Sequence, residues 1–341
     1  MYQAEYSGIN AFLIGSCRLL LNKGVQRKTR GRICYELPEP YIFKILDPTS
    51  RIVTIPIRKW YAPLAYGESL WLATGRNDMD FINRYGSNMK TFSDDGVTMR
   101  GGYGPRLRHY DGNNTDYDVR SMRSETLQEV DQFRYVVECF NKDINTRQAI
   151  INIGDPIKDC FSNDRSLKIS KDIPCTRMLH FMKDAISNKL NLIVTMRSND
   201  LIWGASAVNI FNFTFMQEYF AAILGLEIGT YYHVANNMHY YEDKRKLVEE
   251  IAAVENVTDV HFEYKKSFKS LEAFDTLLKE LSQEEMKMRK EINSYQYHIF
   301  NDDFFQDWYN VLFCKLTKRN VEFINPILNN VIESGSFTKR L

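Results

Sequence analysis

Hydrophobic residues recur with a helical period in three long stretches of the chain. Residues 10–22 and 61–72 place apolar side chains three or four positions apart, which is the spacing of one helix face. Residues 209–225 predict a third helix, long and apolar. Gly24 and Gly225 mark where the first and third helices are expected to end.

Shorter runs between these helices are rich in β-branched and aromatic residues and predict strands. The runs are residues 32–46, 51–57, 147–153, 191–198 and 228–241. A further helix is expected within 127–143, and the polar, turn-rich stretch 106–125 before it predicts a surface insertion. Strands and helices mix without strict alternation, which predicts an α+β fold with a large mixed or antiparallel sheet flanked by helices.

Helical spacing dominates the sequence from about Ser267 onward. Residues 270–281 place leucine and phenylalanine on one helix face. Ser282 followed by Glu285 resembles a capping box, which predicts that a new helix begins there. Another helix is expected to start near Asp302.

The bulk composition is that of ordinary globular protein. The chain has 341 residues, of which 44% are hydrophobic and 26% charged, enough for one large domain or two modest ones. We expect a main domain over residues 1–265 and a helical C-terminal extension over 266–341. Basic and acidic residues alternate through the extension, so a solvated helical face is the ordinary interpretation, with dimer extension or a partner site as the alternative.

Charge and cysteine usage exclude several classes of function. The 44 basic and 43 acidic residues leave a net charge of +1, so no global field attracts nucleic acid, and any anion site must be local. The cysteines at 17, 34, 139, 160, 175 and 314 form no close pair, which argues against a metal site or a disulfide framework and favours a reducing, cytoplasmic compartment. The apolar run near the N-terminus contains Arg18 and is too short to span a membrane.

Cys175 is the first residue with possible chemistry, because it follows Pro174 in a polar context between two predicted strands. A buried, inert cysteine is the ordinary interpretation, since a thiolate requires positive charge nearby. Arg197 lies where the next strand could return beside Cys175. A guanidinium there would favour the thiolate and could also bind an anion.

A phosphate site built from side chains is a second possibility. Arg27, Arg147 and Arg197, together with Ser198, offer the planar donors and the hydroxyl that suit a phosphate, although each alone is more often a solvated surface group. The chain lacks a GxxxxGK[ST] loop, and GGYG at 101–104 lacks the following helix of a dinucleotide fingerprint. Side chains would therefore have to hold the phosphate.

Three further side chains could take part in proton transfer or ligand binding. Glu68 lies among apolar residues of the helix predicted over 61–72, and a half-buried carboxylate with a raised pKa can transfer protons. His239 and Tyr241 alternate on a predicted strand, so they would face the same side. Each of the three could equally be structural.

An ordered set of motifs resembles the thymidylate synthase and deoxycytidylate hydroxymethylase superfamily over residues 10 to 262, most of the chain. The set is Arg27, Glu68-x-x-Trp71, Tyr103-Gly104, Arg147, Pro174-Cys175, Arg197-Ser198-Asn199-Asp200, Gly204, Asn209 and His239-x-Tyr241. The resemblance implies that 1–265 is a thymidylate synthase-like catalytic domain. It also implies a homodimer, a pyrimidine nucleoside monophosphate as substrate and 5,10-methylenetetrahydrofolate as the source of one carbon.

The resemblance also implies a role for each matched residue on the nucleotide. Cys175 would add to C6 of the pyrimidine and make C5 a carbon nucleophile. Arg197 would support the thiolate and hold the phosphate with Ser198, Arg27 and, from the second subunit, Arg147. These assignments agree with the chemistry of the residues themselves.

Proton transfer, base reading and folate binding fall to the remaining matched residues. Glu68 would organise water and protons near O4 and the transferred carbon, and Tyr103 would assist removal of the C5 proton. Asn209 would read the base edge and favour uracil, hence deoxyuridylate, because an amide can accept from N3–H and donate to O4. The remaining implied contacts are Asp200, Trp71 and Met89 for folate, and His239 and Tyr241 for the sugar 3′-hydroxyl.

The chain departs from the family pattern mainly on the folate side. One extra residue lies between Gly204 and Asn209, and no counterpart of the short tail that closes over folate is evident. Closure excludes water from the methylene intermediate, so its absence favours a hydroxymethyl product. We expect a thymidylate synthase first, a uracil or cytosine nucleotide hydroxymethylase second, and a non-catalytic relative that serves as an assembly module third.

Overall fold

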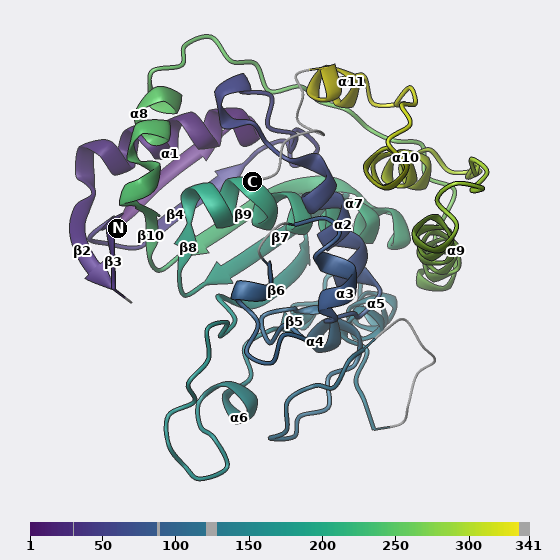
Figure 1. The fold of residues 1–341 in the computed structure, drawn as a ribbon, viewed down its shortest axis with the longest axis horizontal. Coiled ribbons are helices and arrows are strands. Elements are labelled where there is room, and N and C mark those ends of the chain that lie inside the picture. Colours follow the sequence, from purple (N-terminus) through teal and green to yellow (C-terminus); the bar gives the residue numbers. More distant parts are fainter. Residues whose placement is uncertain (30, 87–88, 121–127, 334–341) are drawn as a thin grey trace.

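The computed structural model describes residues 1–29, 31–86, 89–120 and 128–333. Its largest element is a six-stranded sheet in the order β1-β4-β9-β7-β6-β5 (Figure 1). The strands are β1 (Tyr2–Tyr6), β4 (Tyr41–Ile45), β5 (Ile150–Asn152), β6 (Thr176–Lys183), β7 (Lys189–Met196) and β9 (Glu227–Ala235). The pairs β1/β4 and β7/β9 are parallel and the other pairs antiparallel, which confirms the predicted mixed sheet and α+β class.

A second, four-stranded sheet has the order β2-β3-β10-β8. Its strands are β2 (Val25–Thr29), β3 (Arg32–Glu36), β8 (Asn199–Asp200) and β10 (Met238–Tyr241). The run predicted as one strand over 228–241 is thus divided between the two sheets, with β9 in the first and β10 in the second. As a result, β8, which follows β7, and β10, which follows β9, pair with each other.

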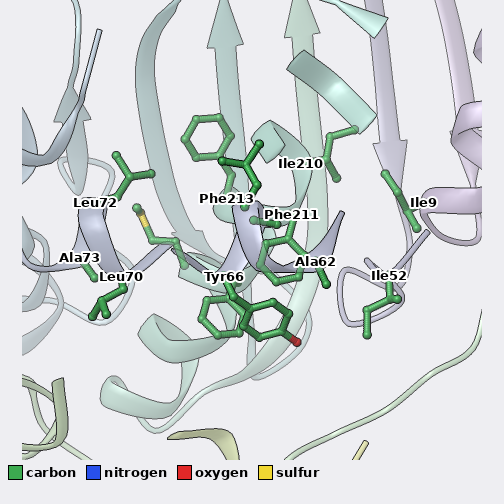
Figure 2. Packing of buried hydrophobic residues seen from close by; sticks show 14 of the residues in the cluster. Ile9, Ile52, Ala62, Tyr66, Leu70, Leu72, Ala73, Ile210, Phe211 and Phe213 are labelled. Atoms are coloured by element: carbon green, nitrogen blue, oxygen red, sulfur yellow. The ribbon is translucent and has the colours of Figure 1, made fainter. Parts of the chain in front are cut away.

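Three predicted helices are confirmed, and each buries apolar side chains in the core. They are α1 (Ile9–Lys23), α2 (Ala62–Ala73) and α7 (Ile210–Ile223). Gly225 has a φ of +66°, a left-handed conformation that glycine adopts without strain, so α7 ends where the sequence predicts. Tyr66 of α2 packs on Phe211 of α7 with ring centroids 4.8 Å apart (Figure 2).

Shorter helices connect these elements. They are α3 (Met79–Ile82), α4 (Gly104–Arg108), α5 (Gln132–Lys142), α6 (Pro156–Asp159) and α8 (Arg245–Ala252). Single turns of 3₁₀-helix lie at η1 (Pro56–Arg58), η2 (Met89–Thr91) and η4 (Glu242–Lys244). The segment η3 (Leu201–Asn209) is a π-helix that leads directly into α7. No helix of the described residues is long and apolar enough to cross a membrane.

The six-stranded sheet has two unlike faces. Along β7 and β9, alternate side chains such as Val194 and Tyr231 are fully buried against the side where α7 packs. The opposite face is only half-buried. Its side chains are Ile42, Lys44, Met178, His180, Met182, Ile193, Thr195, Tyr232 and Val234. A half-buried face of this size, apolar over much of its area, can pair with another surface.

The C-terminal part is helical, as predicted, and consists of α9 (Leu271–Lys290), α10 (Asp303–Thr317) and α11 (Pro326–Glu333). Of these, α9 and α10 lie beside α2 and α7 (Figure 1). Trp308 donates its indole N–H to the carbonyl oxygen of Tyr66 at 2.9 Å, and the side chains of both parts share one hydrophobic core. The division at residue 265 stays a prediction.

Three local predictions are wrong. The run 51–57 forms no strand, because Arg51 turns inward to a buried ion pair with Glu218 and Pro56 starts a 3₁₀ turn. The stretch 106–125 is not wholly a surface insertion, since Arg106 is buried in α4 against Asp159 at 2.7 Å; residues 121–125 lie outside the described part.

The third wrong prediction concerns the helix start at Ser282. This residue lies inside the continuous helix α9. Glu285, which resembled the second half of a capping box, instead accepts a hydrogen bond from Tyr85 at 2.9 Å and pairs with Arg289. The side chain therefore joins α9 to the main core.

Candidate active site

Cys175 lies immediately before β6, and the structure places Arg197 beside it. The backbone N–H of Arg197 donates to the carbonyl oxygen of Cys175 at 2.9 Å. The Arg197 guanidinium donates to the carbonyl oxygens of Pro174 at 3.1 Å and Ile173 at 2.8 Å. Cys175 is half-buried, so neither a sealed core nor a fully exposed surface surrounds it. The cation is therefore anchored on the backbone that leads to the sulfur.

Tyr103 also lies close to Cys175. Its hydroxyl oxygen accepts a hydrogen bond from the backbone N–H of Thr176, the next residue, at 3.3 Å. Burial raises the pKa of Tyr103, and the nearby Cys175 raises it further. Tyr103 thus keeps its proton at neutral pH and can donate it or pass it through bound water.

Glu68 is the one residue of α2 whose side chain is not fully buried. Its carboxyl accepts a hydrogen bond from the Asn212 amide of α7 at 3.0 Å, and Ser69 fixes that amide by donating to its oxygen at 2.7 Å. Burial and then the charge of Asp172 raise the pKa of Glu68 to about 8, which the Asn212 bond partly opposes. Glu68 is therefore largely protonated at neutral pH.

Asp172 is a site residue that the sequence reasoning missed. It lies three residues before Cys175 and accepts a hydrogen bond from the backbone N–H of Gly101 at 2.7 Å. A Cβ at Gly101 would lie 2.4 Å from this carboxylate, so only glycine permits the contact. Burial raises the pKa of Asp172 to about 6. The signal was present in the sequence as a carboxylate directly upstream of the nucleophile and as the glycine pair before Tyr103.

A network of hydrogen-bonded polar side chains joins the four-stranded sheet to the end of β7. Asn237 accepts hydrogen bonds from Ser198 at 3.4 Å and His239 at 2.8 Å, and its amide donates to Glu36 at 2.8 Å. Arg27 of β2 pairs with the same Glu36 at 3.1 Å. The structure thus brings together three of the predicted residues, and Asn237 and Glu36 link them.

Asp200 and Tyr241 border the same network of polar side chains. Asp200 is the register partner of His239 and caps the π-helix by accepting from the backbone N–H groups of Ile202 and Trp203. Burial raises the pKa of Asp200 and the charge of His239 lowers it. Tyr241 contacts His239 ring to ring at 5.3 Å, which places both on one side of β10, as predicted.

Asn209 is the last residue of the π-helix η3. Its amide nitrogen donates to the side-chain oxygen of Asn199 at 3.1 Å and lies 3.8 Å from the sulfur of Met196. A π-helix takes more residues per turn than an α-helix. This segment contains the position, between Gly204 and Asn209, where the resemblance implies one extra residue.

Arg147 does not lie beside Cys175 within the chain. It precedes β5, where Ile150 pairs with His180, so it lies at the far end of β6, about 20 Å from Cys175. Arg147 is exposed and lines a cavity of about 700 Å³ together with Gln148 and Met178. This cavity adjoins the half-buried face of the sheet.

The side chains on the folate side of the site differ in their exposure to solvent. Trp71 and Met89 are buried, and the Trp71 indole donates to the carbonyl oxygen of Asp78 at 3.1 Å. Phe92 and Trp203 are 40% and 37% exposed and stack with centroids 6.3 Å apart. Trp203 follows Asp200 by three residues and was missed by sequence reasoning, although a tryptophan at a helix start was visible. Among the described residues, no group of three or more His, Cys, Asp or Glu side chains could hold a metal ion.

Comparison with known proteins gives concordant results. The thymidylate synthase family model matches residues 14–297. The chain is 35% identical over 243 residues to a deoxyuridylate hydroxymethyltransferase of Bacillus phage SP01, covering 70% of this chain and 59% of that one. It is 30% identical over 230 residues to a protein of the same name from Pseudomonas phage M6, covering 67% and 59%.

A more distant relative carries the other name of the superfamily. A putative thymidylate synthase of Methanocaldococcus jannaschii is 30% identical over 121 residues, which is 34% of this chain and 50% of that protein. The chain spans 59% of the length of each of the two phage relatives. Since the family model covers most of the sequence, the chain belongs to the thymidylate synthase family.

Proposed function

We propose that this chain transfers one carbon from methylenetetrahydrofolate to C5 of deoxyuridylate and releases the hydroxymethyl product. The observation that carries the proposal is the half-buried Cys175, with Arg197 held on the backbone before it and the Asp172 carboxyl three residues upstream, close enough to act on Glu68. Burial raises the pKa of Glu68 to about 8 and that of Asp172 to about 6. At neutral pH one is an acid and the other a base, which is the arrangement that activates water. Two relatives named deoxyuridylate hydroxymethyltransferase support the same product.

Cys175 acts as the nucleophile in this proposal. Its sulfur adds to C6 of the pyrimidine, and the electron pair of the 5,6 double bond moves to C5 and O4. The Arg197 guanidinium, held by two backbone carbonyls, supplies positive charge next to the sulfur. Glu68, in its protonated form, stabilises the charge that develops at O4.

Tyr103 and Asp172 act after the nucleophile has added. The Tyr103 hydroxyl, which accepts a hydrogen bond from the N–H of Thr176 next to Cys175, relays the proton that leaves C5. Asp172 takes a proton from water as the oxygen bonds to the exocyclic methylene carbon. The electron pair of the methylene double bond moves into the ring, and the ring then expels the Cys175 thiolate from C6. No oxidation or reduction occurs in this sequence of steps.

The nucleotide binds to the network of polar side chains at the four-stranded sheet. Arg197, Ser198 and Arg27 hold the phosphate, and Arg147 of a second copy completes the site across a two-fold interface, because Arg147 lies too far from Cys175 within one chain. We assign the half-buried sheet face to that homodimer contact. His239 and Tyr241 bind the sugar 3′-hydroxyl.

Folate binding falls to the exposed side of the site. When bound, methylenetetrahydrofolate would supply the one-carbon unit to C5 and leave as tetrahydrofolate, with no change of oxidation state. The stacked, exposed rings of Phe92 and Trp203 suit a flat pterin or aminobenzoyl ring, so the residues present fit this group. The Asp200 carboxyl lies at the start of the same segment and can bond to a polar ring edge. Trp71 and Met89 lie beneath the surface and support the site by packing.

The experiment is mass analysis of the nucleotide after incubation of the protein with deoxyuridylate and methylenetetrahydrofolate. The hydroxymethyl product exceeds the methyl product by one oxygen, so the two are distinguished directly. We expect the hydroxymethyl nucleotide, and no product with Cys175→Ala. A methyl product with formation of dihydrofolate would instead make the chain a thymidylate synthase. Release of the C5 proton by Cys175→Ala at the unaltered rate would contradict the nucleophile.

A further inference from the structure

A chain of hydrogen bonds runs from the core of the large sheet to the side chain of Asn209. The Tyr231 hydroxyl bonds to Nδ1 of His233 at 2.8 Å, and Nε2 of His233 bonds to the Asn199 amide nitrogen at 3.2 Å. The Asn199 oxygen accepts from the Asn209 amide nitrogen at 3.1 Å. Tyr231, His233 and Asn199 are all buried, so water does not compete for these bonds.

Burial keeps the histidine of this hydrogen-bonded series neutral. His233 is fully enclosed and stacks on Phe43 at 4.8 Å, and burial lowers the pKa of His233 to about 3. A neutral imidazole has one donor and one acceptor nitrogen. With Nε2 as the acceptor, Asn199 points its NH₂ group at His233 and its oxygen at Asn209.

The reverse direction would require Asn209 to point its oxygen at Asn199. Met196 opposes that arrangement, because the Asn209 amide end also faces the Met196 sulfur at 3.8 Å and a thioether is only an acceptor. Gly204 keeps the pair closely packed, since a Cβ there would lie 2.6 Å from the Asn199 oxygen and 3.0 Å from the Asn209 nitrogen. The donor end of Asn209 is therefore held inward.

We infer that Asn199, held by His233 and Tyr231, is a positioning residue that turns the Asn209 amide oxygen toward the base and thereby selects uracil over cytosine. The inference rests on the proposed function and deepens it. In the described part of the chain, no hydrogen bond uses the Asn209 oxygen, so this acceptor is available to a ligand.

The two bases differ at the atom that meets this oxygen. Uracil carries a proton on N3 and donates it to the amide oxygen. Cytosine has a lone pair on N3, which opposes an acceptor, and pairing with it would require Asn209 to turn over. Turning over would break the bond to Asn199 and place oxygen against the Met196 sulfur. A site that leaves polar groups unpaired with the wrong ligand rejects it.

The test measures dissociation constants of deoxyuridylate and deoxycytidylate by calorimetry, without folate, for the unaltered protein and for Asn199→Ala and His233→Phe. Asn199→Ala removes the acceptor that holds Asn209. His233→Phe keeps a ring stacked on Phe43 but removes the nitrogen that orients Asn199. Asn310→Ala is the matched control, because Asn310 is a buried, hydrogen-bonded asparagine of α10.

We expect the unaltered protein and Asn310→Ala to prefer deoxyuridylate equally, and the preference to fall about tenfold in Asn199→Ala and in His233→Phe. A preference that stays within about twofold of the unaltered value in both variants would overturn the inference. Equal affinity of the unaltered protein for the two nucleotides would overturn it as well. Failure of the unaltered protein to bind either nucleotide would instead contradict the proposed function.

Discussion

Replacing Asp172 with asparagine removes one negative charge from beside Glu68 and leaves the shape of the side chain nearly unchanged. Asp172 must be ionised to accept a proton from water, so product formation rises as pH passes about 6. Glu68 must be protonated to stabilise charge at O4, so the rate falls as pH passes about 8. The unaltered protein is therefore expected to show a bell-shaped profile centred near neutral pH.

The Asp172→Asn variant is expected to change this profile in two ways. The acidic limb disappears, because asparagine does not titrate. The alkaline limb moves to lower pH, because the charge of Asp172 contributes to the raised pKa of Glu68. Loss of a general base lowers the rate of hydroxymethyl formation by about 10²-fold or more. The assay is product mass and kcat/KM between about pH 5 and about pH 9.

Asp94→Asn is the control for this variant. Charged groups around Asp172 include Asp94, which raises the pKa of Asp172, and Arg106 and Arg100, which lower it. The control should keep the acidic limb and move it to lower pH. An acidic limb that persists near pH 6 in Asp172→Asn, or an undiminished rate, would refute the assignment of the base.

Three further predictions follow from contacts already described. Asn212→Ala removes the hydrogen bond that lowers the pKa of Glu68, so the alkaline limb of kcat/KM should move above pH 8, opposite to Asp172→Asn; no movement would contradict the contact. Trp308→Ala should reduce the free energy of unfolding in urea by about 3–5 kcal/mol, since the ring is buried and bonded to Tyr66; a loss below about 1 kcal/mol would contradict this packing. Ile193→Arg places a charge in the middle of the half-buried sheet face and should yield monomers in sedimentation, whereas an unchanged mass would place the dimer contact elsewhere.

Regular elements could be predicted wherever local signals agreed with tertiary packing. The ends of α1 and α7 followed from Gly24 and Gly225, and the strand β9 followed from the β-branched and aromatic residues of its run. The run 51–57 misled because its β-branched residues favour a strand, whereas Arg51 is buried against Glu218 and Pro56 begins a 3₁₀ turn. A residue that pairs with a partner far along the chain gives no local signal of its burial.

The candidate site was predictable in part for the same reason. Cys175 and Arg197 follow from adjacent antiparallel strands, whose register brings them together. Asp172 was missed because its importance depends on Gly101, which lies in another loop. The bonds between His233 and Asn199 join β9 to β8, and nothing in the sequence indicates that these side chains meet.

The π-helix η3 forms the wall of the site next to Asn209, and its winding determines how that wall can change in length. A residue added inside a regular helix rotates everything after it by about 100°. The wider turn of residues 201–209 would confine such an addition to this segment, so that α7 and its buried aromatic rings keep the orientation that the sheet requires. Chain length near the base can thus vary while the scaffold behind it stays fixed, and removal of one residue from this segment would turn the amide at 209 away from its partner.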